Sequence, residues 1–135
     1  MPSFHDSAQT GAPPEEVWKL LYDPSRFPEW WAGIATVEIA DGEDGEYTIY
    51  PDGYPDFPMA QLLDTAREQQ RVTVSCLVSD LRYDWLLEPL GPGAGTRISV
   101  DVEIPEAEAA RLEDQRRTIS ASLANLAHLS ALTVD

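Results

Sequence analysis

The chain has 135 residues, 43% of them hydrophobic and 24% charged, which is typical of one folded domain and excludes a largely disordered chain. Nine lysines and arginines stand against 24 aspartates and glutamates, and the resulting net charge of −15 disfavours binding to nucleic acid or to anionic membranes. A single cysteine, no signal-like N-terminus and no apolar run of about 20 residues together predict a cytoplasmic protein without disulfides or membrane insertion.

The N-terminal segment is expected to form one strand and two short helices. Residues 3–10 alternate, so that Phe4, Asp6, Ala8 and Thr10 would share one face of a strand. Pro14 is followed by two glutamates, a composition typical of the first turn of a helix. Residues 23–31 contain two prolines and several aromatic side chains, which predicts a second, very short helix or turn.

The middle of the chain has the period of two that indicates β-strands. In the clearest strand Ile98, Val100 and Val102 point one way and the charged residues between them the other, as in an antiparallel sheet with one buried face. Turn-forming residues at 41–45 and 91–95 indicate hairpins. The expected strands span about 34–40, 45–51, 58–66, 71–79, 81–89 and 95–104.

Residues 106–132 are predicted to form one long helix after Pro105 ends the sheet. One stripe of this helix carries Leu112, Ile119, Leu123, Leu126 and Ser130. Because the buried face of the sheet must be covered, and this helix is the element long enough to do so, we expect an α+β fold in one domain, residues 1–135. That fold is a curved antiparallel sheet of about seven strands around the C-terminal helix, with two short helices after the first strand.

Several short motifs occur along the chain in the same order as in a known protein superfamily. They are Gly11-Ala12-Pro13-Pro14-Glu15-Glu16-Val17-Trp18, Asp23-Pro24, Phe27-Pro28-Glu29-Trp30, Tyr83-x-Trp85-x-Leu87-x-Pro89 and Gly95-Thr96-Arg97-Ile98. Together they resemble the START-like, or polyketide cyclase/dehydrase-like, helix-grip superfamily (SRPBCC type). The resemblance implies a ligand cavity between the sheet and the long helix. It leaves the function open, because the superfamily contains lipid carriers, hormone receptors and aromatic cyclases.

Aromatic side chains and polar residues beside the helix stripe are the candidates to line such a cavity. The expected lining residues are Trp31, Tyr47, Leu62, Cys76, Tyr83, Trp85, Arg116, Ile119, Ser122 and Leu123. Arg116 has two interpretations: it meets an acidic group of the ligand, or it reaches from the helix edge to water. The segment 50–58, rich in proline and aromatic residues, is either a lid over the cavity or a rigid turn.

The sequence contains no strong catalytic motif. Cys76 lies in a strand without a basic neighbour and is interpreted as a small buried side chain rather than a nucleophile. Asp6 is either a cavity acid or a residue at the sheet edge. His5 and His128 are too far apart to suggest a metal site, residues 91–95 lack the lysine of a phosphate-binding loop, and no cofactor is expected.

Three functions are compatible with these features. The first is a binding module, monomeric or homodimeric, for a small hydrophobic molecule such as an aromatic or polyketide-like compound. The second is a polyketide cyclase or dehydrase with a general acid or base in the cavity. The third is an accessory domain that binds another protein, for which the sequence shows no clear apolar surface.

Overall fold

The structure, a computed structural model, describes residues 3–39, 46–51, 53, 56–77, 81–91 and 93–132. Its strands are β1 (Ser3–Thr10), β2 (Ile34–Ile39), β3 (Glu46–Pro51), β4 (Met59–Ala66), β5 (Arg71–Cys76), β6 (Arg82–Gly91) and β7 (Gly95–Glu103). Its α-helices are α1 (Pro14–Leu21), α2 (Phe27–Trp30) and α3 (Leu112–Leu132), and short 3-10 turns are η1 (Pro24–Arg26), η2 (Arg67–Gln69) and η3 (Glu106–Arg111). This order confirms the predicted α+β fold. The expected turn at 41–45 lies outside the described residues.

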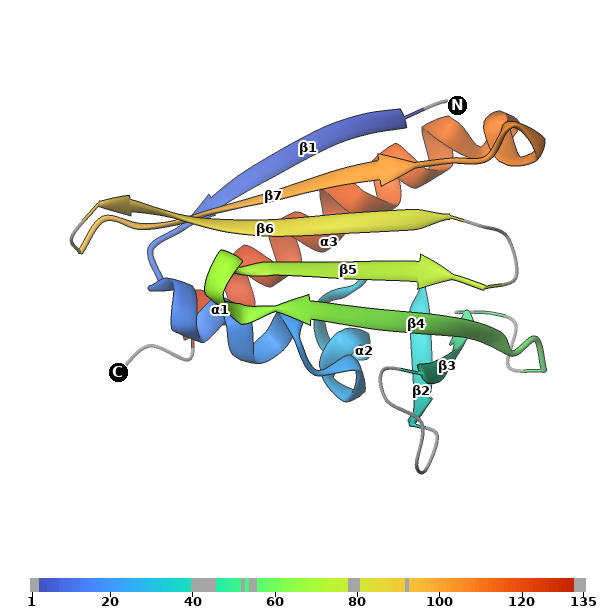
Figure 1. Cartoon of the computed structure of the whole chain (residues 1–135), viewed down its shortest axis with the longest axis horizontal. Helices are drawn as coiled ribbons and strands as arrows, with labels where there is room; N and C mark the ends of the chain where they lie inside the picture. Colours follow the sequence, from blue (N-terminus) through green and yellow to red (C-terminus); the bar gives the residue numbers. More distant parts are fainter. Residues whose placement is uncertain are drawn as a thin grey trace.

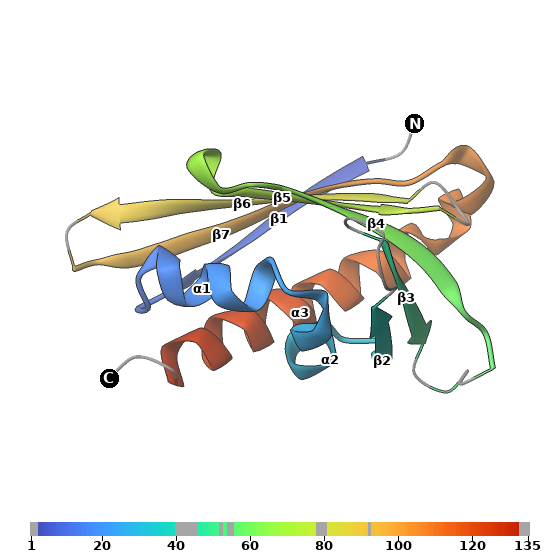
Figure 2. The same cartoon turned by 60° about the horizontal axis from the view of Figure 1, so that its bottom comes forward.

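The seven strands form one antiparallel sheet in the order β1-β7-β6-β5-β4-β3-β2 (Figure 1). Strands β2 to β6 each pair with the next along the chain, and β7 also pairs with β1, so β1 and β2 occupy opposite edges. In Figure 1, β2 and β3 run steeply across the direction of the other strands, which gives the sheet its curvature. Figure 2 shows that α1, α2 and α3 all lie against the same face.

The alternation of side chains places the core between the sheet and these helices. Val100 and Val102 of β7 are fully buried, whereas Asp101 between them is exposed on the opposite face. From the helical side, Ile119 and Leu123 of α3 are buried against the same core. The predicted stripe of the C-terminal helix is therefore the face that covers the sheet.

Hydroxyl groups join the end of β1 to the last helix and to the β6–β7 hairpin. The Oγ1 atom of Thr10 donates to the carbonyl oxygen of Ala127 at 2.9 Å, and Thr96 Oγ1 donates to the carbonyl oxygen of Ala12 at 2.8 Å. Gly95 sits beside them with φ +103°, where a Cβ atom would overlap the backbone oxygen of Thr10. Glycine is required at this point both by the backbone conformation and by the close approach of β1.

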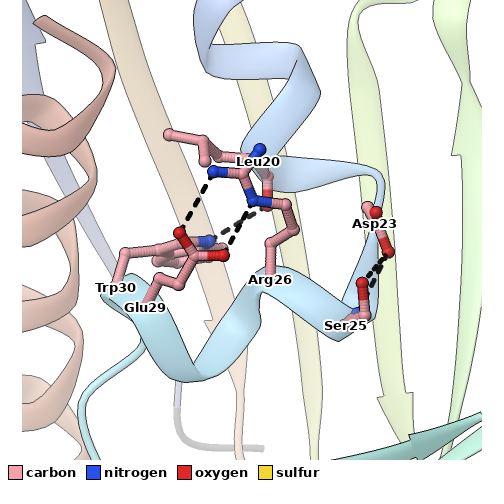
Figure 3. A network of polar contacts seen from close by, with 6 residues as sticks. All are labelled: Leu20, Asp23, Ser25, Arg26, Glu29 and Trp30. Atoms are coloured by element: carbon pink, nitrogen blue, oxygen red, sulfur yellow. Dashed lines mark hydrogen bonds and ion pairs between the residues drawn. The ribbon is translucent and has the colours of Figure 1, made fainter. Parts of the chain in front are cut away.

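Polar contacts fix the two short helices to each other (Figure 3). The buried indole of Trp30 donates from Nε1 to the carbonyl oxygen of Leu20 at 3.0 Å, which satisfies an acceptor at the end of α1. Asp23 Oδ1 accepts from the backbone nitrogen and the hydroxyl of Ser25, at 3.1 and 2.6 Å, and caps the turn between the helices.

An exposed ion pair spans the second of these helices. Arg26 binds Glu29 with two parallel hydrogen bonds, Nε to Oε2 at 2.8 Å and the terminal nitrogen to Oε1 at 3.1 Å (Figure 3). The hydrogen bond from Arg26 lowers the pKa of the Glu29 carboxyl below its ordinary value.

Candidate functional site

Packed aromatic rings fill most of the space between the sheet and the helices. The ring of Trp31 lies 5.0 Å from that of Tyr83 and 5.3 Å from that of Trp85, both edge to face, and 5.3 Å from the ring of Trp30 in a stacked arrangement. The Trp85 indole nitrogen has no hydrogen-bond acceptor among the described residues. The rings of Trp30, Trp31, Tyr83 and Trp85 thus form part of the packed core.

An open cleft of about 240 Å³ remains beside this core. Strands β3 to β6 form one wall, and the N-terminal end of α3 with the preceding turn η3 forms the other. The segment from α2 to β2 completes it. The lining residues are Trp31, Ala32, Gly33, Ile34, Ile49, Met59, Gln61, Cys76, Leu81, Tyr83, Arg111, Asp114, Gln115 and Thr118.

Three of the predicted lining residues, Trp31, Cys76 and Tyr83, border this cleft. Five others do not border it and are buried in the core, namely Tyr47, Trp85, Ile119, Ser122 and Leu123. The sequence analysis thus identified inward-facing residues, but most of them pack in the core and do not border the cleft.

Leu62 and Arg116 do not border this cleft either. Leu62 is 37% exposed on the outer face of β4, and its neighbour Gln61, only 4% exposed, takes the inward position. Arg116 lies on the exposed side of α3, with its guanidinium carbon 5.7 Å from the centre of the Phe4 ring. The arginine that borders the cleft is Arg111, at the end of η3.

The remaining candidates from the sequence lie away from the cleft. Asp6 is on the inward side of the edge strand β1, where its Oδ1 accepts from the backbone nitrogen of Ser7 at 2.8 Å. His5 faces outward and contacts Asp101 at 2.7 Å, and His128 is exposed on α3. Within the described parts of the chain, no group of histidine, cysteine and acidic residues is arranged to hold a metal ion.

The segment 50–58 includes residues 52, 54 and 55, which lie outside the described residues, so its role as a lid stays a prediction.

Two tyrosine–glutamine pairs, which the sequence analysis missed, give the cleft its polar groups. Tyr47 donates from its hydroxyl to Gln61 Oε1 at 2.8 Å, and Tyr83 donates to Gln115 Oε1 at 3.0 Å. Burial raises the pKa of both tyrosines well above their ordinary value, and Arg111 only partly opposes this for Tyr83. Both phenols are therefore neutral donors near pH 7.

Helix α3 also holds the wall of the cleft that carries Trp31. The hydroxyl of Ser122 accepts from the backbone nitrogen of Ala32 at 2.9 Å and donates to the carbonyl oxygen of Thr118 at 2.7 Å. The side-chain amide of Asn125 donates to the carbonyl oxygen of Trp30 at 3.2 Å. The predicted site residue Ser122 thus supports the wall from behind instead of facing the cleft.

Solved structures with the same fold include proteins named as aromatase/cyclases. ZhuI aromatase/cyclase from Streptomyces sp. R1128 is 14% identical, with a TM-score of 0.76 over 96% of this chain and 93% of that chain. The di-domain aromatase/cyclase BexL from the BE-7585A biosynthetic pathway is 16% identical, with a TM-score of 0.78 over 95% of this chain and 46% of that chain. The XoxI protein from Bacillus cereus is 16% identical, with a TM-score of 0.76 over 96% of this chain and 95% of that chain.

No curated protein matches the chain. None of the helices in the described part is long and apolar enough to cross a membrane. The model of one protein family matches residues 1–131, nearly the whole chain, in agreement with the motifs and with the helix-grip fold. The chain therefore belongs to the family described as polyketide cyclase / dehydrase and lipid transport.

Proposed function

We propose that the protein binds a small, largely apolar molecule with a flat ring system in the cleft beside Trp31. The observation that carries this proposal is the composition of the walls. The rings of Trp31 and Tyr83 meet at right angles there, and the apolar side chains of Ile49, Met59 and Leu81 complete the lining. Aromatic and aliphatic walls with a few polar groups are typical of small-molecule sites.

The size of the cleft limits the ligand. Sites for drug-sized molecules typically enclose about 300–1,000 Å³, and this cleft has a volume of about 240 Å³. One or two fused rings fit this space, whereas a long acyl chain or a tetracyclic compound would require the aromatic core to move. Binding without chemistry is the simplest function for such a site.

A second candidate is a cyclase or dehydrase acting on a short keto compound. It is favoured by the family and by the hydroxyl of Tyr83 at the cleft wall. Because burial raises the pKa of Tyr83, this phenol would act by donating a hydrogen bond or a proton, not as a base. Turnover of a keto substrate that disappears in Tyr83→Phe would support this candidate.

The test of binding is a titration of the ¹⁵N-labelled protein with the bicyclic ketone 1-tetralone, followed by NMR. We expect a dissociation constant between about 1 µM and 1 mM, with backbone shifts concentrated at residues 31–34. Thr118→Trp fills the cleft from the helix side and should abolish binding. Thr36→Trp adds the same side chain at an exposed position and should not. Equal binding to both variants would show that the ligand sits elsewhere.

A further inference from the structure

The amide group of Gln61 is the most deeply buried polar group that lines the cleft. The residue is 4% exposed, and its Oε1 atom accepts the hydroxyl hydrogen of Tyr47 at 2.8 Å. The amide nitrogen makes no hydrogen bond to the rest of the described protein. This nitrogen is not fully enclosed, because Trp85 Nε1 is the sole fully buried side-chain nitrogen or oxygen without a partner among the described residues. It is therefore a free donor at the cleft wall, where a ligand acceptor would be stabilised.

The hydroxyl of Tyr47 determines which end of this amide is available. A side-chain amide has an acceptor oxygen and a donor nitrogen, and the two ends exchange when the group rotates by half a turn. In the structure the oxygen faces Tyr47 and accepts from its hydroxyl. The nitrogen with its two hydrogens is left for the cleft.

Gln115 repeats this arrangement from the opposite wall. It projects from α3, whereas Gln61 projects from β4, and both residues line the same cleft. Its Oε1 atom accepts from the hydroxyl of Tyr83 at 3.0 Å, which again leaves the NH₂ group as the unused end. Two walls thus offer hydrogen-bond donors of the same kind, and the acceptor oxygen of each amide already accepts one hydrogen bond from a tyrosine.

We infer that Gln61 and Gln115 select a ligand whose ring carries a neutral acceptor oxygen, such as a ketone or a quinone, over ligands that carry a hydrogen-bond donor. This inference rests on the proposed function, since it assigns the polar contacts of the same cleft. A carbonyl oxygen has two lone pairs and accepts two N–H groups. Tyr47 and Tyr83 act as positioning residues, because each fixes the orientation of one amide.

The charge around the cleft favours a neutral oxygen over a carboxylate. The two selecting groups are uncharged amides. The carboxylate of Asp114 also borders the cleft, although its Oδ1 contacts Arg117 at 2.7 Å, and the whole chain carries a net charge of −15. The guanidinium of Arg111 lies at the same rim and reduces this repulsion without removing the preference.

The experiment compares three bicyclic probes of the same skeleton: 1-tetralone, tetralin, which lacks the oxygen, and tetralin-1-carboxylate. The unaltered protein should bind the ketone roughly 2- to 13-fold more tightly than the hydrocarbon, the gain expected of one neutral hydrogen bond. The side-chain NH₂ signals of Gln61 and Gln115 are visible in ¹H–¹⁵N spectra. They should move downfield with the ketone and not with the hydrocarbon.

Variants separate the amides from the ring-binding walls. Gln115→Met alone would leave the hydroxyl of Tyr83 without its acceptor, so it is combined with Tyr83→Phe. This double variant should lower the ketone preference and leave tetralin affinity within about threefold. Gln61→Met alone would strand the hydroxyl of Tyr47, so the double variant Tyr47→Phe with Gln61→Met removes both polar groups together. Tyr47→Phe alone lets the amide rotate, so it should reduce the ketone preference and improve binding of a donor probe such as 1-aminotetralin in its neutral form.

The outcomes distinguish this inference from the proposed function. If the ketone and the hydrocarbon bind the cleft equally and the two glutamine signals stay in place, the inference is wrong and the proposed function stands. Tighter binding of the carboxylate than of the ketone would also overturn the selection of a neutral oxygen. If neither ring compound binds, the proposed function fails.

Discussion

Removing the hydroxyl of Ser122 should loosen the cleft wall that carries Trp31. In Ser122→Ala the backbone nitrogen of Ala32 loses its acceptor at 2.9 Å in a half-buried place. An unmatched donor of this kind costs about 1–3 kcal/mol, and partial exposure places it toward the lower end. Alanine is better than serine in a helix by about 0.5 kcal/mol. The net loss of unfolding free energy should therefore be about 0.5–1.5 kcal/mol.

The control is Ser120→Ala, at an exposed position of the same helix, which should gain up to about 0.5 kcal/mol from helix propensity alone. Both free energies come from urea unfolding followed by tryptophan fluorescence. A second readout is the affinity for 1-tetralone, which should fall in Ser122→Ala and stay constant in the control. If the two variants unfold at the same urea concentration, the hydroxyl does not hold this wall.

Three further substitutions test the fold. Gly95→Ala should cost about 2–4 kcal/mol, because strain at positive φ is joined by overlap with the backbone of β1, whereas Gly93→Ala, also at positive φ but with open space, should cost about 1 kcal/mol. Leu123→Ala should cost about 2–5 kcal/mol by leaving a cavity under α3. Glu29→Gln should cost up to about 0.5 kcal/mol near pH 7 and nothing near pH 2. The pKa of Glu29 is lowered in the folded state, so the contribution of its pair with Arg26 is present above the unfolded pKa and is lost as the pH falls through the folded one.

Urea unfolding measures each of these differences. Equal losses for the two glycine variants would mean that the approach of β1 does not constrain Gly95. A loss below about 1 kcal/mol for Leu123→Ala would mean that α3 does not seal the core at this point. A loss in Glu29→Gln that is the same at both pH values would exclude the ion pair as its cause.

Local patterns were sufficient to predict the fold. Strict alternation in β7 and the apolar stripe of α3 each determine which side is buried, and these two faces can only cover each other. The proline at the start of α1 and the glycine turn before β7 set boundaries that the structure reproduces closely.

The site was harder to predict, for two physical reasons. In β4 hydrophobicity favours Leu62 as the inward residue, yet the inward position belongs to Gln61, which lies opposite Tyr47 and Cys76 in the neighbouring strands. The register in which β4 pairs with its neighbours determines which of its side chains faces inward, and the sequence of β4 alone does not reveal that register. On α3 the apolar stripe has two polar flanks, and the sequence does not show which one borders open space. Gln115 lies on that flank, whereas Arg116 is turned toward Phe4.

The strand order also has a consequence for how the molecule is made. β1 leaves the ribosome first, yet its partner in the sheet is β7, so that Ser3 pairs with Glu103, and its hydroxyl contacts are with α3. The hairpins from β2 to β7 can pair as they emerge, while β1 has to wait unpaired for nearly the whole length of the chain. Because Gln115 and Thr118 come from α3, the cleft cannot form until this helix has been synthesised.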